Sequence, residues 1–173
     1  MQRLTGYGLR LDTQLAVPGA IGTIGSGPPD VSIVLEPPQA IADTSVYART
    51  QDGLCFTCPD VARYWISQGA IRVAPDPAAQ SDMVSDMLVA TALPAMLWLR
   101  ERFVLHAGAV QLPGGGTVAI AGASGSGKST VLAQLVAAGA ALIGDDTIAF
   151  SRDTGTQAQG LAGGWFAAGE AAA

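Results

Sequence analysis

A glycine-rich segment that ends in the chain's only lysine constrains this sequence more than any other feature. Residues 122–129 read Gly-Ala-Ser-Gly-Ser-Gly-Lys-Ser, which fits the spacing G-x-x-x-x-G-K-[ST]. Glycines let backbone N–H groups converge on anionic oxygens, and a helix that starts here adds the partial positive charge of its N-terminus. Eight arginines carry the remaining positive charge, so the lone Lys128 indicates a need for a compact ammonium rather than a planar guanidinium. The segment therefore predicts a loop that binds the phosphates of a nucleotide.

The segments around this loop predict an α/β nucleotide-binding core. We expect a buried strand over residues 117–121, a helix from about 127 to 138, and a short strand over 141–144 that lies beside the loop strand. Gly139 is expected to end the helix. A further strand is expected over 103–112. The order strand, loop, helix, strand is the one that a phosphate loop requires.

Polar residues in and around the core suggest how the chemistry would be divided. Lys128 is expected to contact the β- and γ-phosphates, and Ser129 to place its hydroxyl on Mg²⁺. Asp145 and Asp146 are adjacent carboxylates that point in different directions, so one could serve the metal and the other a substrate hydroxyl; the alternative is a pair that makes a turn or caps the next segment. His106 is the only histidine, and spacing alone favours a structural role for it over a functional one. The residues expected to hold the nucleotide are Gly122, Ala123, Ser124, Gly125, Ser126, Gly127, Lys128, Ser129 and Thr130.

The chain before the core is broken by glycine and proline into short runs that resemble β-strands. A strand is expected over residues 31–35, and residues 64–73 read as a hairpin with the two-residue turn Gln68-Gly69. Residues 1–80 therefore predict a small, mostly antiparallel, β-rich N-terminal unit.

The second predicted region, residues 81–150, combines a helix with the nucleotide-binding core. Ser81 is a candidate N-cap for a helix that runs to about Arg100. Pro94 is expected to kink or break this helix, because proline lacks a backbone donor and clashes with the preceding turn. The third region, residues 151–173, is rich in glycine and alanine and has no segment that reads as a strand pair. It predicts a disordered terminus or a truncated or frameshifted end.

The composition narrows the class of protein. Of 173 residues, 49% are hydrophobic and 13% charged, which is typical of a folded chain. The net charge of −5 without a basic cluster argues against a nucleic-acid partner. The longest apolar run, residues 87–99, contains Pro94 and is too short to cross a membrane, so we expect a cytoplasmic protein. Cys55 and Cys58 are expected to be structural cysteines, with redox chemistry or weak metal binding as the alternatives.

Three segments together resemble the HPr kinase/phosphorylase family. They are Leu105-His-Ala-Gly-Ala-Val110, the glycine loop, and Leu142-Ile-Gly-Asp-Asp146. Within this family, the segments look closer to the short HPr-kinase-like proteins of lasso-peptide-type gene clusters. The resemblance implies an HPr kinase/PEP carboxykinase-like core, ATP and Mg²⁺ as cofactors, and a small protein or peptide as substrate. It also implies a possible homo-oligomer.

The same resemblance assigns roles to individual residues. It implies that Asp146 is the acid/base on a seryl hydroxyl, which leaves Asp145 for the Mg²⁺. It also implies that His106 and Lys128 act beside Asp146 at the phosphates. The family continues with a Mg²⁺-binding glutamate and a catalytic arginine, neither of which matches a residue of 151–173. The core is therefore expected to be incomplete.

These observations lead to a ranked set of functions. The first is an ATP-dependent kinase that phosphorylates a serine hydroxyl of a small protein or peptide. The alternatives are a nucleotide-binding fragment without turnover, a general P-loop ATPase, and a gene fragment that folds poorly.

Overall fold

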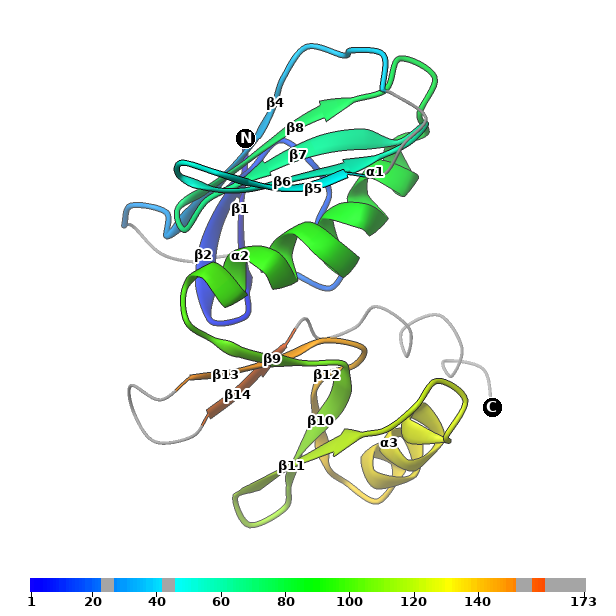
Figure 1. Ribbon diagram of the computed structural model, residues 1–173. Helices are drawn as coiled ribbons and strands as arrows, with labels where there is room; N and C mark the ends of the chain where they lie inside the picture. The colour runs from blue at the N-terminus through cyan, green and yellow to red at the C-terminus, as the bar shows by residue number, and fades with distance from the viewer. Residues whose placement is uncertain (23–26, 42–45, 152–156, 161–173) are drawn as a thin grey trace. The chain divides into compact units, whose positions relative to one another are not determined.

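The computed structural model describes residues 1–22, 27–41, 46–151 and 157–160, and has a mixed α/β architecture with mostly strands and few helices. Contacts divide the chain into two compact units (Figure 1). The first unit comprises Met1–Thr5, Leu9–Pro18 and Gly22–Glu101, and the second comprises Gly6–Gly8, Gly19–Ile21 and the chain from Arg102 onward.

An eight-stranded sheet forms most of the first unit. Its order is β3-β1-β2-β4-β8-β7-β6-β5. The strands are β1 Gln2–Gly6, β2 Leu9–Thr13, β3 Ile21–Gly22, β4 Val31–Leu35, β5 Val46–Thr50, β6 Gly53–Cys58, β7 Ala62–Ile66 and β8 Ala70–Pro75.

The pairing of these strands confirms part of the prediction. The strand over 31–35 is β4, and β7 and β8 form the expected hairpin, in which the Ser67 N–H donates to the Ala70 carbonyl at 2.9 Å. Strands β5 to β8 are antiparallel neighbours. Strand β4 pairs in parallel with both β2 and β8, so the sheet is mixed, but the three antiparallel pairings of β5 to β8 outnumber these two, as the prediction of a mostly antiparallel unit requires.

A helix with a π-helical middle packs against one face of this sheet (Figure 1). It consists of α1 Ser81–Met87, the π segment η1 Leu88–Ala92, and α2 Leu93–Leu99. The expected break at Pro94 is absent, since helical structure runs without interruption from Ser81 to Leu99. The missing proline N–H is instead accommodated by a wider π turn just before it. The expected cap is wrong, since Gln80 holds the N-cap position and Ser81 is the first helical residue, with no side-chain capping bond.

The core of the first unit lies between this helix and the sheet. The Tyr64 hydroxyl donates to the Val84 carbonyl at 2.9 Å, and burial raises the pKa of that phenol. The Gln68 amide donates to the Leu99 carbonyl at 2.8 Å and fixes the far end of the helix. These bonds explain why the first unit ends at Glu101 rather than near residue 80, where the sequence suggested a boundary. Fully buried side chains of this core include Ile33, Ile71, Val73, Leu88, Leu93, Met96 and Leu97.

The helical stretch Ser81–Leu99 is also long and apolar enough to meet a length-and-composition criterion for crossing a membrane. Core helices of soluble proteins meet the same criterion. Here Leu88, Leu93 and Met96 are fully buried inside the first unit, which is how a core helix behaves.

Two three-stranded sheets and one helix form the second unit. The sheet orders are β11-β10-β12 and β14-β13-β9. The elements are β9 Phe103–Leu105, β10 Ala107–Leu112, β11 Gly116–Ala121, α3 Lys128–Ala137, β12 Ala141–Gly144, β13 Ile148–Ser151 and β14 Gln157–Gly160. The single strand expected over 103–112 is therefore two strands, which bend apart at His106 and join different sheets.

Strand β10 is the buried centre of the second unit. On one side Ala107 and Ala109 pack with Ile148, and on the other Val110 packs with Leu132 of α3 and with Ala140. Helix α3 ends as predicted at Gly139, which has a left-handed φ of 96°. The Gly139 N–H donates to Val136 and the Ala140 N–H to Leu135, which is the Schellman pattern of bonds.

Two expectations for this unit are wrong. Strand β11 was expected to be buried, but it lies at the edge of its sheet and only Ile120 is partly covered. Residues 157–160 lie in the region expected to lack strand pairing, yet they form β14, which pairs with β13 along its whole length. The rest of that region, 152–156 and 161–173, lies outside the described residues.

We predict that Tyr64→Phe lowers the free energy of unfolding by about 1 kcal/mol, because the substitution removes a buried hydrogen bond to the Val84 carbonyl, which then keeps only the helical N–H of Leu88. Urea denaturation would measure the change. Tyr47→Phe is the matched control, since Tyr47 is 73% exposed and should change stability little. Equal effects of the two substitutions would contradict the role given to the Tyr64 hydroxyl.

Candidate functional site

Three segments that are distant in the sequence meet at one edge of the β11-β10-β12 sheet. Both outer strands run antiparallel to β10, so β11 and β12 end where β10 begins. In this register Ala107 lies opposite Ala121, and Ala109 opposite Gly144. His106, which precedes β10, therefore lies at the same edge as the glycine loop and the Asp145-Asp146 pair.

This arrangement corrects one part of the sequence prediction. The strand that leads to the aspartates was expected beside the loop strand, but β10 lies between them. Because β11 and β12 still run in the same direction, the loop and the aspartates still meet. The intervening strand also brings the histidine to this edge.

The glycine loop runs from Gly122 to Gly127 and connects β11 to α3. Gly125 and Gly127 have left-handed φ angles of 76° and 88°, which favour glycine. A Cβ on Gly122 would lie 2.8 Å from the Ser126 hydroxyl, so this position also needs a glycine. The Ser126 N–H donates to the Ala123 carbonyl at 3.2 Å and tightens the turn. The loop therefore ends at the N-terminus of a ten-residue helix, where free N–H groups favour an anion.

Lys128 lies across this loop. Its ammonium donates to the carbonyls of Gly122 and Ala123 at 2.9 and 3.0 Å. An ammonium has three N–H donors. Two of them hold the loop together, and the third remains for an oxygen of a bound ligand.

Ser129 and Asp145 lie together beside the lysine. The Ser129 hydroxyl donates to Asp145 Oδ2 at 3.2 Å, while Asp145 Oδ1 accepts the N–H of Asp146 at 2.9 Å. A hydroxyl and a carboxylate oxygen are the hard donors that Mg²⁺ prefers, usually completed by phosphates and water. Within the described part of the chain, no group of three histidine, cysteine or acidic side chains could hold a metal by itself. Ser129 and Asp145 could therefore supply two of the oxygen ligands of a metal, with the others coming from a phosphate ligand and water.

Asp146 points away from its neighbour and toward His106. Its Oδ1 lies 3.1 Å from His106 Nδ1, and the two side chains are 61% and 57% exposed. The backbone of Asp146 has a left-handed φ of 74°, which is unusual for a residue other than glycine. This turn separates the two carboxylates, so that Asp145 meets Ser129 and Asp146 meets the imidazole. Such a pair can orient a carboxylate for proton transfer to or from a reactive hydroxyl.

Gly108 on β10 leaves room for the side chain of Asp145. Sequence reasoning missed this residue. A Cβ at this position would collide with the Leu132 side chain and lie 3.0 Å from Asp145 Oδ1. Only a residue without a side chain lets helix α3 and Asp145 both approach the strand.

Tyr7 is a second residue that sequence reasoning missed. Residues 6–8 belong to the second unit, and the Tyr7 side chain is 2% exposed there. Its phenol is hydrogen-bonded to the Thr147 side chain. Burial raises the pKa of Tyr7, the bond to Thr147 opposes that shift, and the nearby charge of Asp146 adds to it. The backbone of Tyr7 has a left-handed φ of 54°. Glycine and asparagine are the residues that usually indicate such a conformation, so a tyrosine gave no sign of it in the sequence.

Three candidate residues remain. Thr130 is exposed at the start of α3 and has no polar contact within the described residues. Cys55 and Cys58 lie on β6 in the first unit and are both free. Residues three apart on a strand point to opposite faces, so the two thiols do not form a site together. Burial raises the pKa of the Cys58 thiol, and the charge of Asp60 raises it further.

Comparison of the chain with protein-family models, with curated proteins and with solved structures found no significant match.

We predict that Gly108→Ala destabilises the second unit by about 1–3 kcal/mol, because the new methyl group overpacks against Leu132. Thermal unfolding followed by circular dichroism would measure the loss. Gly116→Ala is the matched control, since its Cβ would meet nothing within 4 Å. If Gly108→Ala were as stable as the control, the close packing at Gly108 would be wrong.

Proposed function

We propose that this protein is an ATP-dependent kinase of the HPr kinase type, which transfers the γ-phosphate of ATP to a serine hydroxyl of a small protein or peptide. The observation that carries the proposal is the division of labour at Asp145 and Asp146. The Asp145 carboxylate accepts a hydrogen bond from Ser129. The Asp146 carboxylate lies 3.1 Å from the imidazole of His106. A phosphate loop alone serves many NTPases, whereas a separate, oriented carboxylate also serves a hydroxyl acceptor.

The proposal includes a fold, namely a P-loop core built on β11, α3, β10 and β12. It is supported by the glycine geometry of the loop, by the N-terminus of α3, and by the Lys128 ammonium that lies across both. Phosphate oxygens would receive N–H bonds from this helix end and from the third donor of Lys128.

Magnesium bound to the nucleotide would neutralise charge that develops on the phosphates during transfer. Ser129 and Asp145 are the residues that would hold it. Both offer oxygen atoms, and Asp145 is partly buried beside Gly108, so its carboxylate is fixed in place.

Asp146 would take the proton from the acceptor. As the serine oxygen bonds to the γ-phosphorus, the bond from that phosphorus to the β-γ bridging oxygen breaks and the electron pair leaves with ADP. The serine proton passes to Asp146, whose orientation is set by His106 at 3.1 Å. Both side chains are more than half exposed, so the proton can return to solvent directly after transfer.

We expect Lys128→Ala to weaken ATP-Mg²⁺ binding at least tenfold, because the ammonium both shapes the loop and provides a charge for the phosphates. Isothermal titration calorimetry on both proteins would measure the loss. Thermal unfolding without nucleotide serves as the control for folding. ATP binding that is equal in the two proteins would overturn the phosphate-loop assignment.

The two aspartates should give different defects. Asp146→Asn should keep ATP-Mg²⁺ affinity within about twofold while lowering the transfer rate by about 10²–10⁴-fold, whereas Asp145→Asn should raise the Mg²⁺ concentration required. Phosphopeptide formed from serine-containing peptides would be measured by mass spectrometry, and ADP by a coupled assay. ADP produced without phosphopeptide would instead identify an ATPase. Tight ATP binding with neither product would identify a nucleotide-binding protein without turnover.

A further inference from the structure

The first unit has a binding surface of its own, where the edge of its sheet meets the end of its helix. Strand β5 is the last strand in the sheet order, and among the described residues it pairs only with β6. As far as the described residues go, its outer edge therefore presents unpaired backbone N–H and C=O groups, which are a template for another strand. Tyr47, Ala48, Arg49 and Thr50 are all exposed along it.

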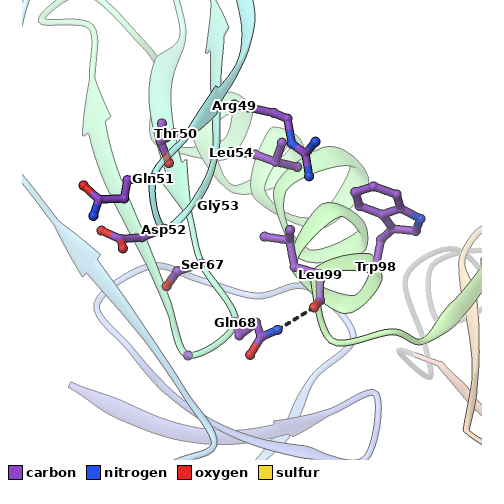
Figure 2. Close-up of a pocket in the computed structure, with 11 residues that line it drawn as sticks. Arg49, Thr50, Gln51, Asp52, Gly53, Leu54, Ser67, Gln68, Trp98 and Leu99 are labelled. Carbon is purple, nitrogen blue, oxygen red and sulfur yellow. Dashed lines mark hydrogen bonds between the residues drawn. The ribbon is translucent and has the colours of Figure 1, made fainter.

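A pocket of about 460 Å³ opens at one end of this edge strand (Figure 2). Leu54 of β6 and Leu99 of α2 give it an aliphatic lining, and Trp98 is 62% exposed at its rim. The bond from the Gln68 amide to the Leu99 carbonyl keeps the helix end in position. The pocket is thus built from regular elements rather than from a loop alone.

The pocket has a cation that is available to a ligand. Arg49 lines it and makes no ion pair or hydrogen bond to another side chain within the described part of the chain. Figure 2 shows the Arg49 guanidinium extending toward the same opening as Trp98, while Gln51 and Asp52 extend the other way. An exposed guanidinium beside an apolar surface complements a carboxylate that is attached to an extended chain.

Aromatic stacking continues this surface along β5. Tyr47 is 73% exposed, and its ring stacks on Phe56 at 4.7 Å. Phe56 in turn stacks on Tyr64, whose hydroxyl bonds to the helix. Side chains two apart on a strand share a face, so Tyr47 and Arg49 both lie on the side that the helix covers. A strand added beside β5 would therefore face the ring of Tyr47 and, two residues further along, the guanidinium of Arg49.

We propose that β5 binds an extended peptide segment, which adds a strand to the sheet and places an acidic side chain against Arg49 and an apolar one on Trp98 and Leu54. Backbone bonds to an edge strand supply affinity in such complexes, and side-chain pockets supply selectivity. The proposal concerns residues of the first unit only. It also names the acceptor class if the second unit is a kinase, and to that extent it rests on the proposed function.

The test is the fluorescence anisotropy of a short labelled peptide in which valine alternates with threonine and one central residue is glutamate. Nucleotide is omitted, and the Lys128→Ala protein is tested beside the natural one, so that a failure of the phosphate site does not affect the result. The peptide should bind both proteins equally. Arg49→Glu should weaken binding about tenfold, and Trp98→Ala should weaken it about fivefold or more.

Two matched controls make the result specific to this surface. Arg3→Glu introduces the same charge change at an exposed position on β1 and should leave the affinity unchanged. A peptide with lysine in place of its glutamate should bind poorly to the natural protein and recover on Arg49→Glu. Such an exchange cannot be produced by unfolding of a variant.

Three outcomes would overturn the proposal. The first is absence of peptide binding, and the second is binding that neither Arg49→Glu nor Trp98→Ala changes. The third is a dimer in sedimentation velocity that Arg49→Glu dissociates, which would assign the β5 edge to a second copy of the chain.

Discussion

The candidate site depends on one constraint, which is the direction of the central strand β10. Because β10 runs opposite to both of its neighbours, it begins at the edge where β11 and β12 end. A parallel central strand would carry the preceding histidine to the far edge, away from the loop and the aspartates. Burial holds this strand in place, since Ala107 and Ala109 pack with Ile148 on one side and Val110 packs with Leu132 on the other. The position of each polar group follows from this packing.

Local features of the sequence predicted the parts of the site that are set by local geometry. The glycines of the loop, the start of α3 near Lys128 and its end at Gly139 all depend on backbone conformations within a few residues. For the same reason the β7–β8 hairpin could be read from its turn. Pro94 likewise indicated where the long helix departs from α-helical geometry, although the structure has a π-helical segment there and no break.

Pairings between distant segments could not be read in this way. Nothing in residues 107–112 says that they separate β11 from β12, because hydrophobic alternation gives the face of a strand and not its neighbour. Strand β14 escaped prediction for a related reason, since glutamine and alanine have no strong preference for strands. The contact of Tyr7 with Thr147 joins opposite ends of the described chain and has no local signal. The different directions of the Asp145 and Asp146 side chains were easier to predict, because adjacent side chains in a turn point in different directions.

The bonds from Lys128 to the carbonyls of Gly122 and Ala123 have a consequence for the energetics of ligand binding. A glycine-rich segment is among the costliest to order, since glycine loses the most conformational freedom. Here the ammonium acts as an internal tie, which holds the loop in shape before any phosphate arrives. Much of the ordering cost is then met during folding, so a phosphate ligand would find a preorganised cradle. A single side chain would therefore link the stability of the free loop to its affinity for such a ligand.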